Sequence, residues 1–183
     1  MSEKNTLVRS LHDTGLAAWF GGSLMGAVGL NGATAKAGDP RERTALSAKG
    51  WGRWAPVNAA AIGAHVVGGL GLIAANKSRV AAQPGARMNT IVKSALTGAA
   101  VGLTAYSGAL GRKVAQHADE GAEGATEPHP GASEELGKAQ RQLRLTQWAI
   151  PVVTGALVVL GAQQGEQQRP QSLLRNQLAR LGS

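Results

Sequence analysis

Four stretches of this chain contain no Asp, Glu, Lys or Arg, and the charged residues are concentrated between them. The uncharged stretches are residues 14–35, 54–76, 94–111 and 145–165. Each is long enough, as a helix rising about 1.5 Å per residue, to cross a hydrocarbon core of about 30 Å. A soluble helix of this length normally exposes charges on its wet face. The pattern predicts an all-α integral membrane bundle of four antiparallel transmembrane helices.

The composition of the uncharged stretches leaves one alternative open. The mean hydropathy of the chain is −0.09, which is low for a membrane protein. The stretches are rich in Ala, Gly, Thr and Ser, which partition poorly into lipid but let helices approach closely. Residues 94–111 have the fewest large apolar side chains. The alternative to four membrane spans is therefore a soluble Ala/Gly-rich helical protein.

Composition also excludes several classes of site. Cysteine is absent, which removes disulfides, zinc–thiolate sites, iron–sulfur clusters and thiol nucleophiles. Four Trp, one Tyr and one Phe are too few for base-stacking platforms, so no nucleic-acid partner is expected. The net charge of +8 comes from basic residues that flank the uncharged stretches, which fits contact with anionic lipid headgroups.

The N-terminal segment has two interpretations. Lys4 and Arg9 precede an apolar run, and residues 33–35 (Ala-Thr-Ala) have the form of a signal-peptidase site. The run is longer than a usual signal core and several glycines interrupt it, while Asp13 lies directly before it. A retained first helix is the preferred interpretation, with signal cleavage as the alternative.

The connections predict an orientation. Residues 77–93 are basic with no acid and are costly to translocate, whereas the connection at residues 112–144 is long and acidic. Its middle, rich in Gly and Pro, is predicted to be partly disordered. We therefore expect a multi-pass membrane protein with both termini in the cytoplasm. The Ala, Gly and Arg bias resembles that of proteins from high-GC bacterial genomes, which indicates a bacterial cytoplasmic membrane.

Two further features fit a membrane surface. Trp51, Trp54 and Trp148 lie at the starts of the second and fourth uncharged stretches, which predicts an aromatic belt at one membrane face. Residues 170–183 have leucines spaced by about one helical turn and arginines elsewhere, which predicts an amphipathic surface helix. A partner-binding helix is the alternative for this tail.

Pairs of small residues four positions apart occur in every uncharged stretch. This spacing places both members on one helix face and permits close backbone contact. The pattern predicts helix packing within the bundle, with self-association through one such face as the alternative. The pairs are Gly22 and Gly26, Ala64 and Gly68, Gly98 and Gly102, and Gly161 and Gly165.

His65 lies at the centre of the second uncharged stretch. An ionisable residue at the centre of a membrane is costly and by default suggests a function. The midpoints of the other stretches predict a polar layer of Met25, His65, Thr104 and Thr154, in which a neutral His65 bonds Thr104 or Thr154. A copper or haem site using His and Met, and a proton-handling histidine, are the alternatives.

Other catalytic or metal-binding groups are not indicated by the sequence. Counted from the midpoints, His12, His117 and His129 all lie at other levels than His65, so no bis-histidine haem site is expected. No nucleotide-binding loop, nucleophile elbow or pair of carboxylates is visible in the sequence. The sequence therefore predicts no cofactor, no metal and no enzymatic activity.

The segment from Leu11 to Gly22 carries a local resemblance. Leu11-His12, small residues and then Trp19-x-Gly21-Gly22 resemble the first helix of bacterial four-helix membrane families, including the copper-resistance D-like group. Asp13, and the lack of a second histidine at matching depth, depart from the metal-handling pattern. The whole chain is similar to uncharacterised four-helix integral membrane proteins of high-GC bacteria, which implies a fold and no activity.

The function expected from these features is that of a non-enzymatic membrane component. It is either an accessory subunit or a small binding bundle, with the lipid bilayer, other membrane proteins or a second copy of itself as partners. The alternative is a small transporter or a redox or metal-handling membrane protein that uses His65.

Overall fold

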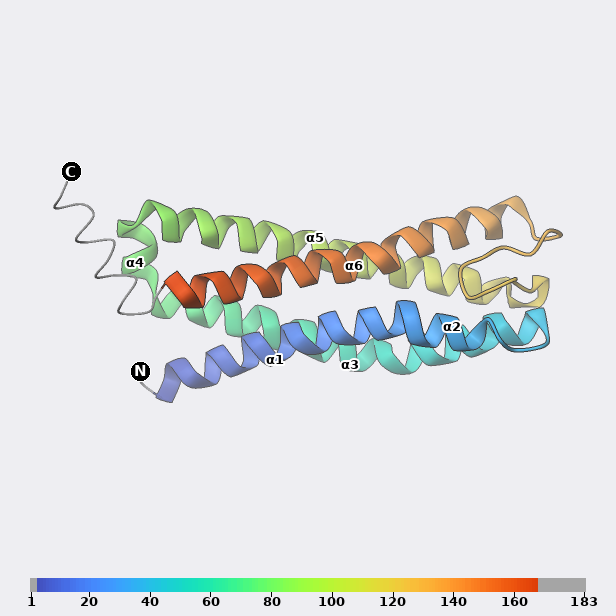
Figure 1. Cartoon of the computed structure of the whole chain (residues 1–183), viewed down its shortest axis with the longest axis horizontal. Coiled ribbons are helices and arrows are strands. Elements are labelled where there is room, and N and C mark those ends of the chain that lie inside the picture. The colour runs from blue at the N-terminus through green and yellow to red at the C-terminus, as the bar shows by residue number, and fades with distance from the viewer. Residues whose placement is uncertain (1–2, 168–183) are drawn as a thin grey trace.

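The computed structural model describes residues 3–167, and its regular elements are helices. Four long helical segments lie side by side in an elongated bundle (Figure 1). Short elements join them, and each predicted uncharged stretch falls mainly on one long helix, the first of them continuing through the short elements that follow it. The elements are α1 (Glu3–Met25), the π-helical turn η1 (Gly26–Leu30), α2 (Asn31–Thr34), α3 (Pro40–Ala75), α4 (Lys77–Ala82), α5 (Pro84–Gln116), the 3-10 turn η2 (Ala118–Glu120) and α6 (Glu134–Gln167).

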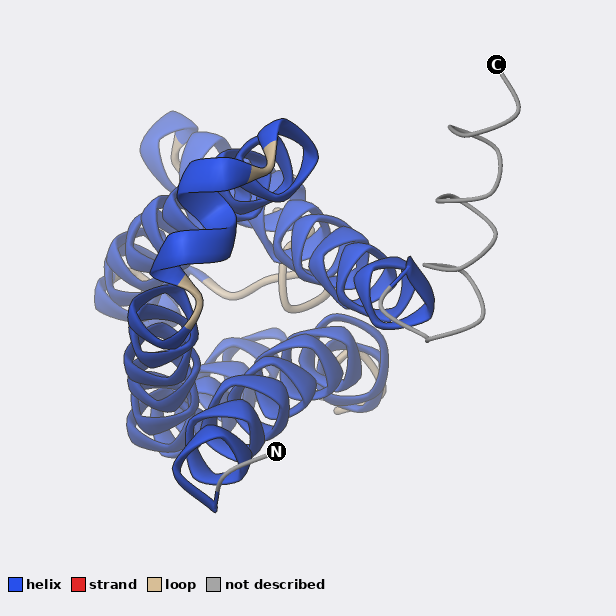
Figure 2. Ribbon diagram, turned by 90° about the vertical axis from the view of Figure 1, so that its left-hand side faces the viewer, coloured by secondary structure: helices blue, strands red, loops and turns tan. Residues whose placement is uncertain are grey.

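The long helices form a ring in which α1 contacts α3, α3 contacts α5, α5 contacts α6 and α6 contacts α1. Consecutive long helices are antiparallel, so the start of α1, the short helix α4 and the end of α6 lie at one end of the bundle (Figures 1 and 2). We call this the α4 end. The connections 35–39 and 117–133 lie at the other end.

Two of the described helices are long and apolar enough to cross a membrane by length and composition, namely α3 and α6 over Glu134–Gly165. The prediction of an all-α fold is confirmed, whereas the structure supports the apolar character of only two of the four spans. The absence of charged residues does not by itself make a helix apolar enough to cross a membrane, because Gly, Ser, Thr and Ala are uncharged yet at most weakly apolar. Residues 170–183, the predicted amphipathic tail, lie outside the described residues.

Helices α1 and α3 approach each other through glycines. A Cβ added at Gly15 would lie 2.5 Å from the carbonyl oxygen of Ala61 and 2.6 Å from the backbone nitrogen of His65. A Cβ at Gly68 would lie 2.6 Å from the carbonyl oxygen of Val8. These distances leave no room for a side chain, so glycine is required at both positions. The predicted packing role is confirmed for Gly68.

Gly22, further along α1, and Gly26, the first residue of η1, receive aromatic rings from α3. The ring of Trp54 occupies the space beside Gly22, and the ring of Trp51 occupies the space beside Gly26. Both glycines therefore pack as predicted. The same contacts correct the prediction of an aromatic belt, because Trp51 and Trp54 pack against α1, while Trp148 is about half exposed.

The predicted packing role is wrong for the glycine pairs of α5 and α6. A Cβ added at Gly98, Gly102, Gly161 or Gly165 would meet no atom within 4 Å. Larger side chains elsewhere join the two helices: Leu110 and Val114 of α5 form a buried cluster with Leu136, Ala139 and Leu143 of α6. Spacing of four places small residues on one face but does not determine whether that face meets a helix.

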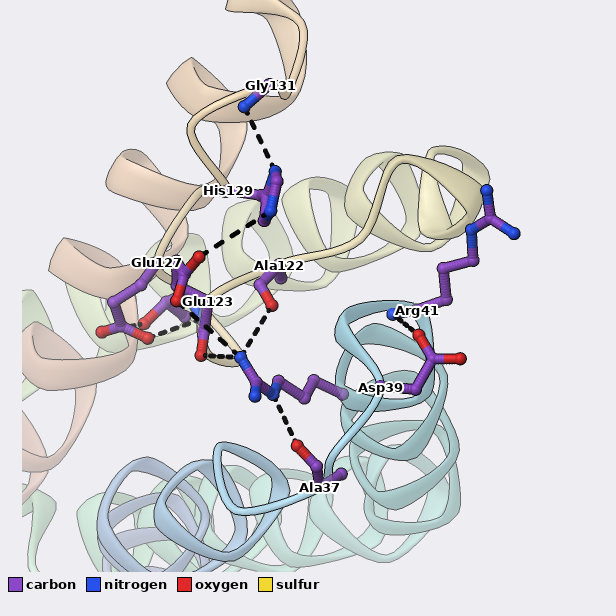
Figure 3. A network of polar contacts seen from close by, with 10 residues as sticks. Ala37, Asp39, Arg41, Ala122, Glu123, Glu127, His129 and Gly131 are labelled. Atoms are coloured by element: carbon purple, nitrogen blue, oxygen red, sulfur yellow. Dashed lines mark hydrogen bonds and ion pairs between the residues drawn. The ribbon is translucent and has the colours of Figure 1, made fainter.

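The acidic connection between α5 and α6 makes specific contacts, where the sequence predicts partial disorder. The Arg43 guanidinium of α3 donates to the carbonyl oxygens of Ala37 at 2.7 Å and Glu123 at 2.9 Å (Figure 3). The Ala122 amide donates to the carbonyl of Pro40 at 3.0 Å. Acidic composition predicts loose structure only when no basic partner is near, and α3 provides one.

Candidate functional site

A cavity of about 760 Å³ lies at the α4 end of the bundle. Its walls come from the first half of α1, the last part of α3, the start of α5 and the last part of α6, together with α4 and its flanking residues. The walls are apolar where Leu16, Leu70, Val101 and Leu157 line them. They are polar at further lining residues, which are Arg9, His12, Asp13, His65, Asn76, Arg79, Asn89, Thr90, Lys93, Ser94, Thr97 and Gln164.

His65 lies at this cavity and is buried, with 3% of its surface exposed. Its Nδ1 is 3.0 Å from the carbonyl oxygen of His12, and its Nε2 is 3.3 Å from the hydroxyl of Thr97. A carbonyl oxygen can only accept, so Nδ1 carries the hydrogen, and in the neutral ring Nε2 accepts from Thr97. Both ring nitrogens therefore have partners, which fixes the orientation of the imidazole.

The ring of His12 lies against that of His65, with ring centroids 4.2 Å apart and the ring planes tilted by 38°. The Nδ1 of His12 bonds the carboxylate of Asp13 at 2.8 Å. The prediction that no two histidines share a level is therefore wrong. The antiparallel register of α1 and α3 is set by close contacts at Gly15 and Gly68, whereas the prediction aligned the midpoints of uncharged stretches.

The predicted layer of Met25, His65, Thr104 and Thr154 does not form around His65. Met25 is 64% exposed and lies about 20 Å along α1 from His12, at 1.5 Å per residue. Thr104 accepts a bond from Nε1 of Trp19 at 3.2 Å, and Thr154 is buried and donates to the carbonyl of Ile150 in its own helix. The partner of His65 is Thr97, which lies seven residues, about two helical turns, before Thr104.

Of the small residues predicted to pack, four fall around this cavity or beside it. Gly98, Gly161 and Gly165 line the cavity, and their missing side chains enlarge it. Gly68 lies at the α1–α3 contact next to His12. Ala64, the partner of Gly68 in the predicted pair, is half-buried on α3.

Lys93 is the cavity residue that the sequence analysis missed. It is half-buried at the start of α5, and its Nζ donates to Oε1 of Gln164 at 2.8 Å. Gln164 is neutral, so this bond does not neutralise the ammonium. In the sequence, Lys93 directly precedes an uncharged stretch. A lysine at such a position is typical of an anchor at the membrane interface, and nothing in the sequence indicates that it lines a cavity.

The charge lining the cavity is mainly positive. Arg9, Arg79 and Lys93 are cationic, and Asp13 supplies the one carboxylate among the lining residues. Asp13 is already bonded to His12, and its side chain is 62% exposed. Within the described part of the chain, no three His, Asp or Glu side chains are placed to hold a metal ion.

Comparison of the chain with family models, with curated proteins and with solved structures finds no match in any of the three. The contacts described above are therefore the basis for a functional proposal.

Proposed function

We propose that the protein is an integral membrane protein of four spans that acts as a non-enzymatic binding component. The observation that carries this proposal is the inverted distribution of side chains in the bundle. Polar residues such as Asn58, Gln147 and Thr154 are buried, while large apolar residues such as Leu70 and Val152 are more than 60% exposed.

Lipid accounts for this inversion better than water does. Exposed apolar side chains follow each of the long helices, for example Leu7 on α1, Val67 on α3, Ile91 on α5 and Val159 on α6. A soluble monomer rarely exposes apolar area on this scale, whereas the hydrocarbon of a bilayer solvates it. Inside the bundle, some polar side chains bond each other or their own helix, such as Asn31 with Gln147 and Thr154 with the carbonyl of Ile150, as lipid requires.

A partly buried series of hydrogen bonds illustrates the interior. Nε1 of Trp51 donates to Oδ1 of Asn31 at 3.0 Å, and Nδ2 of Asn31 donates to Oε1 of Gln147 at 2.7 Å. This series connects α3, α2 and α6. Asn31 directly follows the π-helical turn η1, a type of irregularity that re-aims side chains in helices.

A binding role agrees with the chemistry of the cavity. The imidazole of His65 is held by His12 and Thr97, and Asp13 is paired with His12. These contacts stabilise the cavity wall and leave no activated nucleophile beside it. The basic α4 end supports an orientation with this end in the cytoplasm, next to anionic headgroups.

Single cysteines can test the four-span arrangement because the natural chain has none. Gly38→Cys and Gly131→Cys place thiols at one end, and Ser78→Cys and Gly85→Cys place them at the α4 end, all at exposed positions. A membrane-impermeant maleimide applied to intact cells should label the first pair alone, and all four should react after the membrane is opened.

Two other outcomes would contradict the proposal in distinct ways. If only α3 and α6 cross the membrane, Gly131→Cys will share the labelling of Ser78→Cys instead of that of Gly38→Cys. If the protein does not enter the membrane, all four variants will stay unlabelled in intact cells, and the protein will be released by alkaline carbonate.

A further inference from the structure

We infer that the cavity at the α4 end binds an anionic amphiphile, a molecule with a carboxylate or phosphate head and a hydrocarbon chain. This inference rests on the proposed membrane location. The head would lie near Lys93 and Arg9, and the chain would lie against the apolar walls beside Gly98 and Gly161.

The first argument is the excess of positive charge in the cavity lining. Lys93 bonds the neutral Gln164, and no carboxylate lies within ion-pair distance of Lys93 or Arg9 among the described residues. Asp13, the one acid lining the cavity, bonds His12 and acts on Lys93 only through space, so it offsets one of the three cationic side chains of the lining. An anionic head would neutralise a half-buried ammonium through charge-assisted hydrogen bonds, which are stronger than neutral ones.

The second argument is unfilled apolar space directly next to this charge. The cavity volume of about 760 Å³ falls within the range typical of small-molecule sites. Three lining glycines, at positions 98, 161 and 165, leave space that a side chain would otherwise fill. Val101, Leu157 and Val158 form apolar walls around it. A small hydrophilic anion would leave this surface unused.

The third argument is position. Lys93 directly precedes the uncharged stretch 94–111, so in a membrane it lies at the boundary between headgroups and hydrocarbon. Basic pockets between helices at the cytoplasmic face suit anionic headgroups, whose chains enter from the same leaflet. An amphiphile thus has its head and its chain at the depths that the cavity provides for them.

The test uses the full chain reconstituted in phosphatidylcholine nanodiscs, which contain no anionic lipid. The probe is oleate, with oleyl alcohol as the neutral molecule of equal chain length and inorganic phosphate as an anion without a chain. We expect saturable binding of one oleate, little binding of oleyl alcohol, and no competition by phosphate at equal concentration.

Matched variants locate the head. Arg9→Gln with Lys93→Gln should lower oleate affinity about tenfold or more, since hydrogen bonds to charged groups are lost. Lys93→Arg keeps the charge and should retain binding. Arg53→Gln with Lys49→Gln removes two exposed charges of α3 remote from the cavity lining and should change nothing.

A second pair of variants locates the hydrocarbon chain of the bound oleate. Gly98→Leu fills the cavity and should weaken oleate binding, whereas Gly102→Leu adds the same bulk one turn away, outside the lining residues, and should not. Both positions have open space beside them, so both variants should fold, and thermal unfolding checks this.

Several outcomes would overturn the inference. Equal binding of oleate and oleyl alcohol would remove the role of charge, and full displacement of oleate by phosphate would indicate a site for a free anion. If the control variants lose as much oleate affinity as the cavity variants, the binding site lies elsewhere. Failure to bind oleate in a preparation whose cysteines report four spans would reject the inference and leave the proposed function intact.

Discussion

The two helix pairs of the bundle, α1 with α3 and α5 with α6, use glycine in opposite ways. In the first pair, Gly15 and Gly68 bring backbones into contact, and Gly22 and Gly26 receive tryptophan rings. In the second pair, Gly98 and Gly161 face open space, and leucines near the far end hold the helices together. Small residues at the same spacing thus form a tight contact in one pair and part of a cavity wall in the other.

The difference concerns what lies opposite each glycine. Close contact along α1 and α3 holds His12 against His65 and makes one rigid wall of the cavity. Helices α5 and α6 are joined through Leu110, Val114 and Leu136 at the far end and leave space toward the α4 end. One pair therefore acts as the scaffold, and the other supplies the volume for a ligand.

The largest expected effect comes from breaking the tight contact. Gly15→Leu would place a side chain where even a Cβ lies 2.5 Å from the carbonyl oxygen of Ala61. The helices must separate, and we expect a loss of about 3 kcal/mol or more in the free energy of unfolding in mixed micelles. Gly63→Leu is the control, because it adds the same bulk to α3 at an exposed position with open space beside it. Equal stability of the two variants would show that α1 and α3 do not meet at Gly15.

The next largest effect tests how the scaffold is joined to the other pair. Asn31→Leu leaves Gln147 of α6 and Trp51 of α3 without their shared partner. We expect a loss of about 1–3 kcal/mol, the usual cost of leaving buried polar groups unpaired. Adding Gln147→Leu removes one of the orphaned groups and should recover part of the loss. If the free-energy losses of the two single variants simply add in the double variant, Asn31 and Gln147 do not interact.

The sequence was sufficient to predict an all-helical fold with four long helices, because the alternation of charged and uncharged segments marks where each helix lies. It also identified His65 as a buried polar residue. Thr104 and Thr154, the predicted partners of His65, instead donate to the carbonyls of Ala100 and Ile150 in their own helices.

The sequence could not supply the register between helices. The level of His65 relative to α1 depends on the contact of Gly15 with α3 and on that of Gly68 with α1. Both contacts join residues that are distant in the sequence. For the same reason, Thr97 rather than Thr104 bonds His65, and Lys93 lies in the cavity wall. Spacing within one helix fixes a face, but only the partner helix determines what the face meets.

A smaller effect, of opposite sign, sharpens the comparison between glycines. Gly98→Ala adds a methyl group in open space and removes the conformational freedom of glycine within a helix. We expect a gain of up to about 1 kcal/mol in stability. Gly15→Ala, the same substitution in the tight pair, should destabilise the protein. If both substitutions change unfolding in the same direction, the two glycine environments do not differ as described.

The smallest effect concerns an exposed ion pair that joins α5 to α6 beside the buried cluster of Leu110, Val114 and Leu136. Lys113 Nζ lies 2.7 Å from Oε1 of Glu135, and this bond holds the pKa of Glu135 below its ordinary value. A carboxyl whose pKa is lowered by folding stabilises the native state above its unfolded pKa. That contribution is lost as the pH falls through the lower, folded pKa.

Glu135→Gln should therefore reduce stability slightly at neutral pH, and the difference from the natural protein should disappear in acid. The exposed position and screening by salt keep the effect small, and added salt should reduce it further. Thermal unfolding of both proteins across this pH range measures it, with Glu134→Gln, for which no ion pair is formed among the described residues, as the control. A difference that persists in acid would show that Glu135 contributes through packing rather than through its charge.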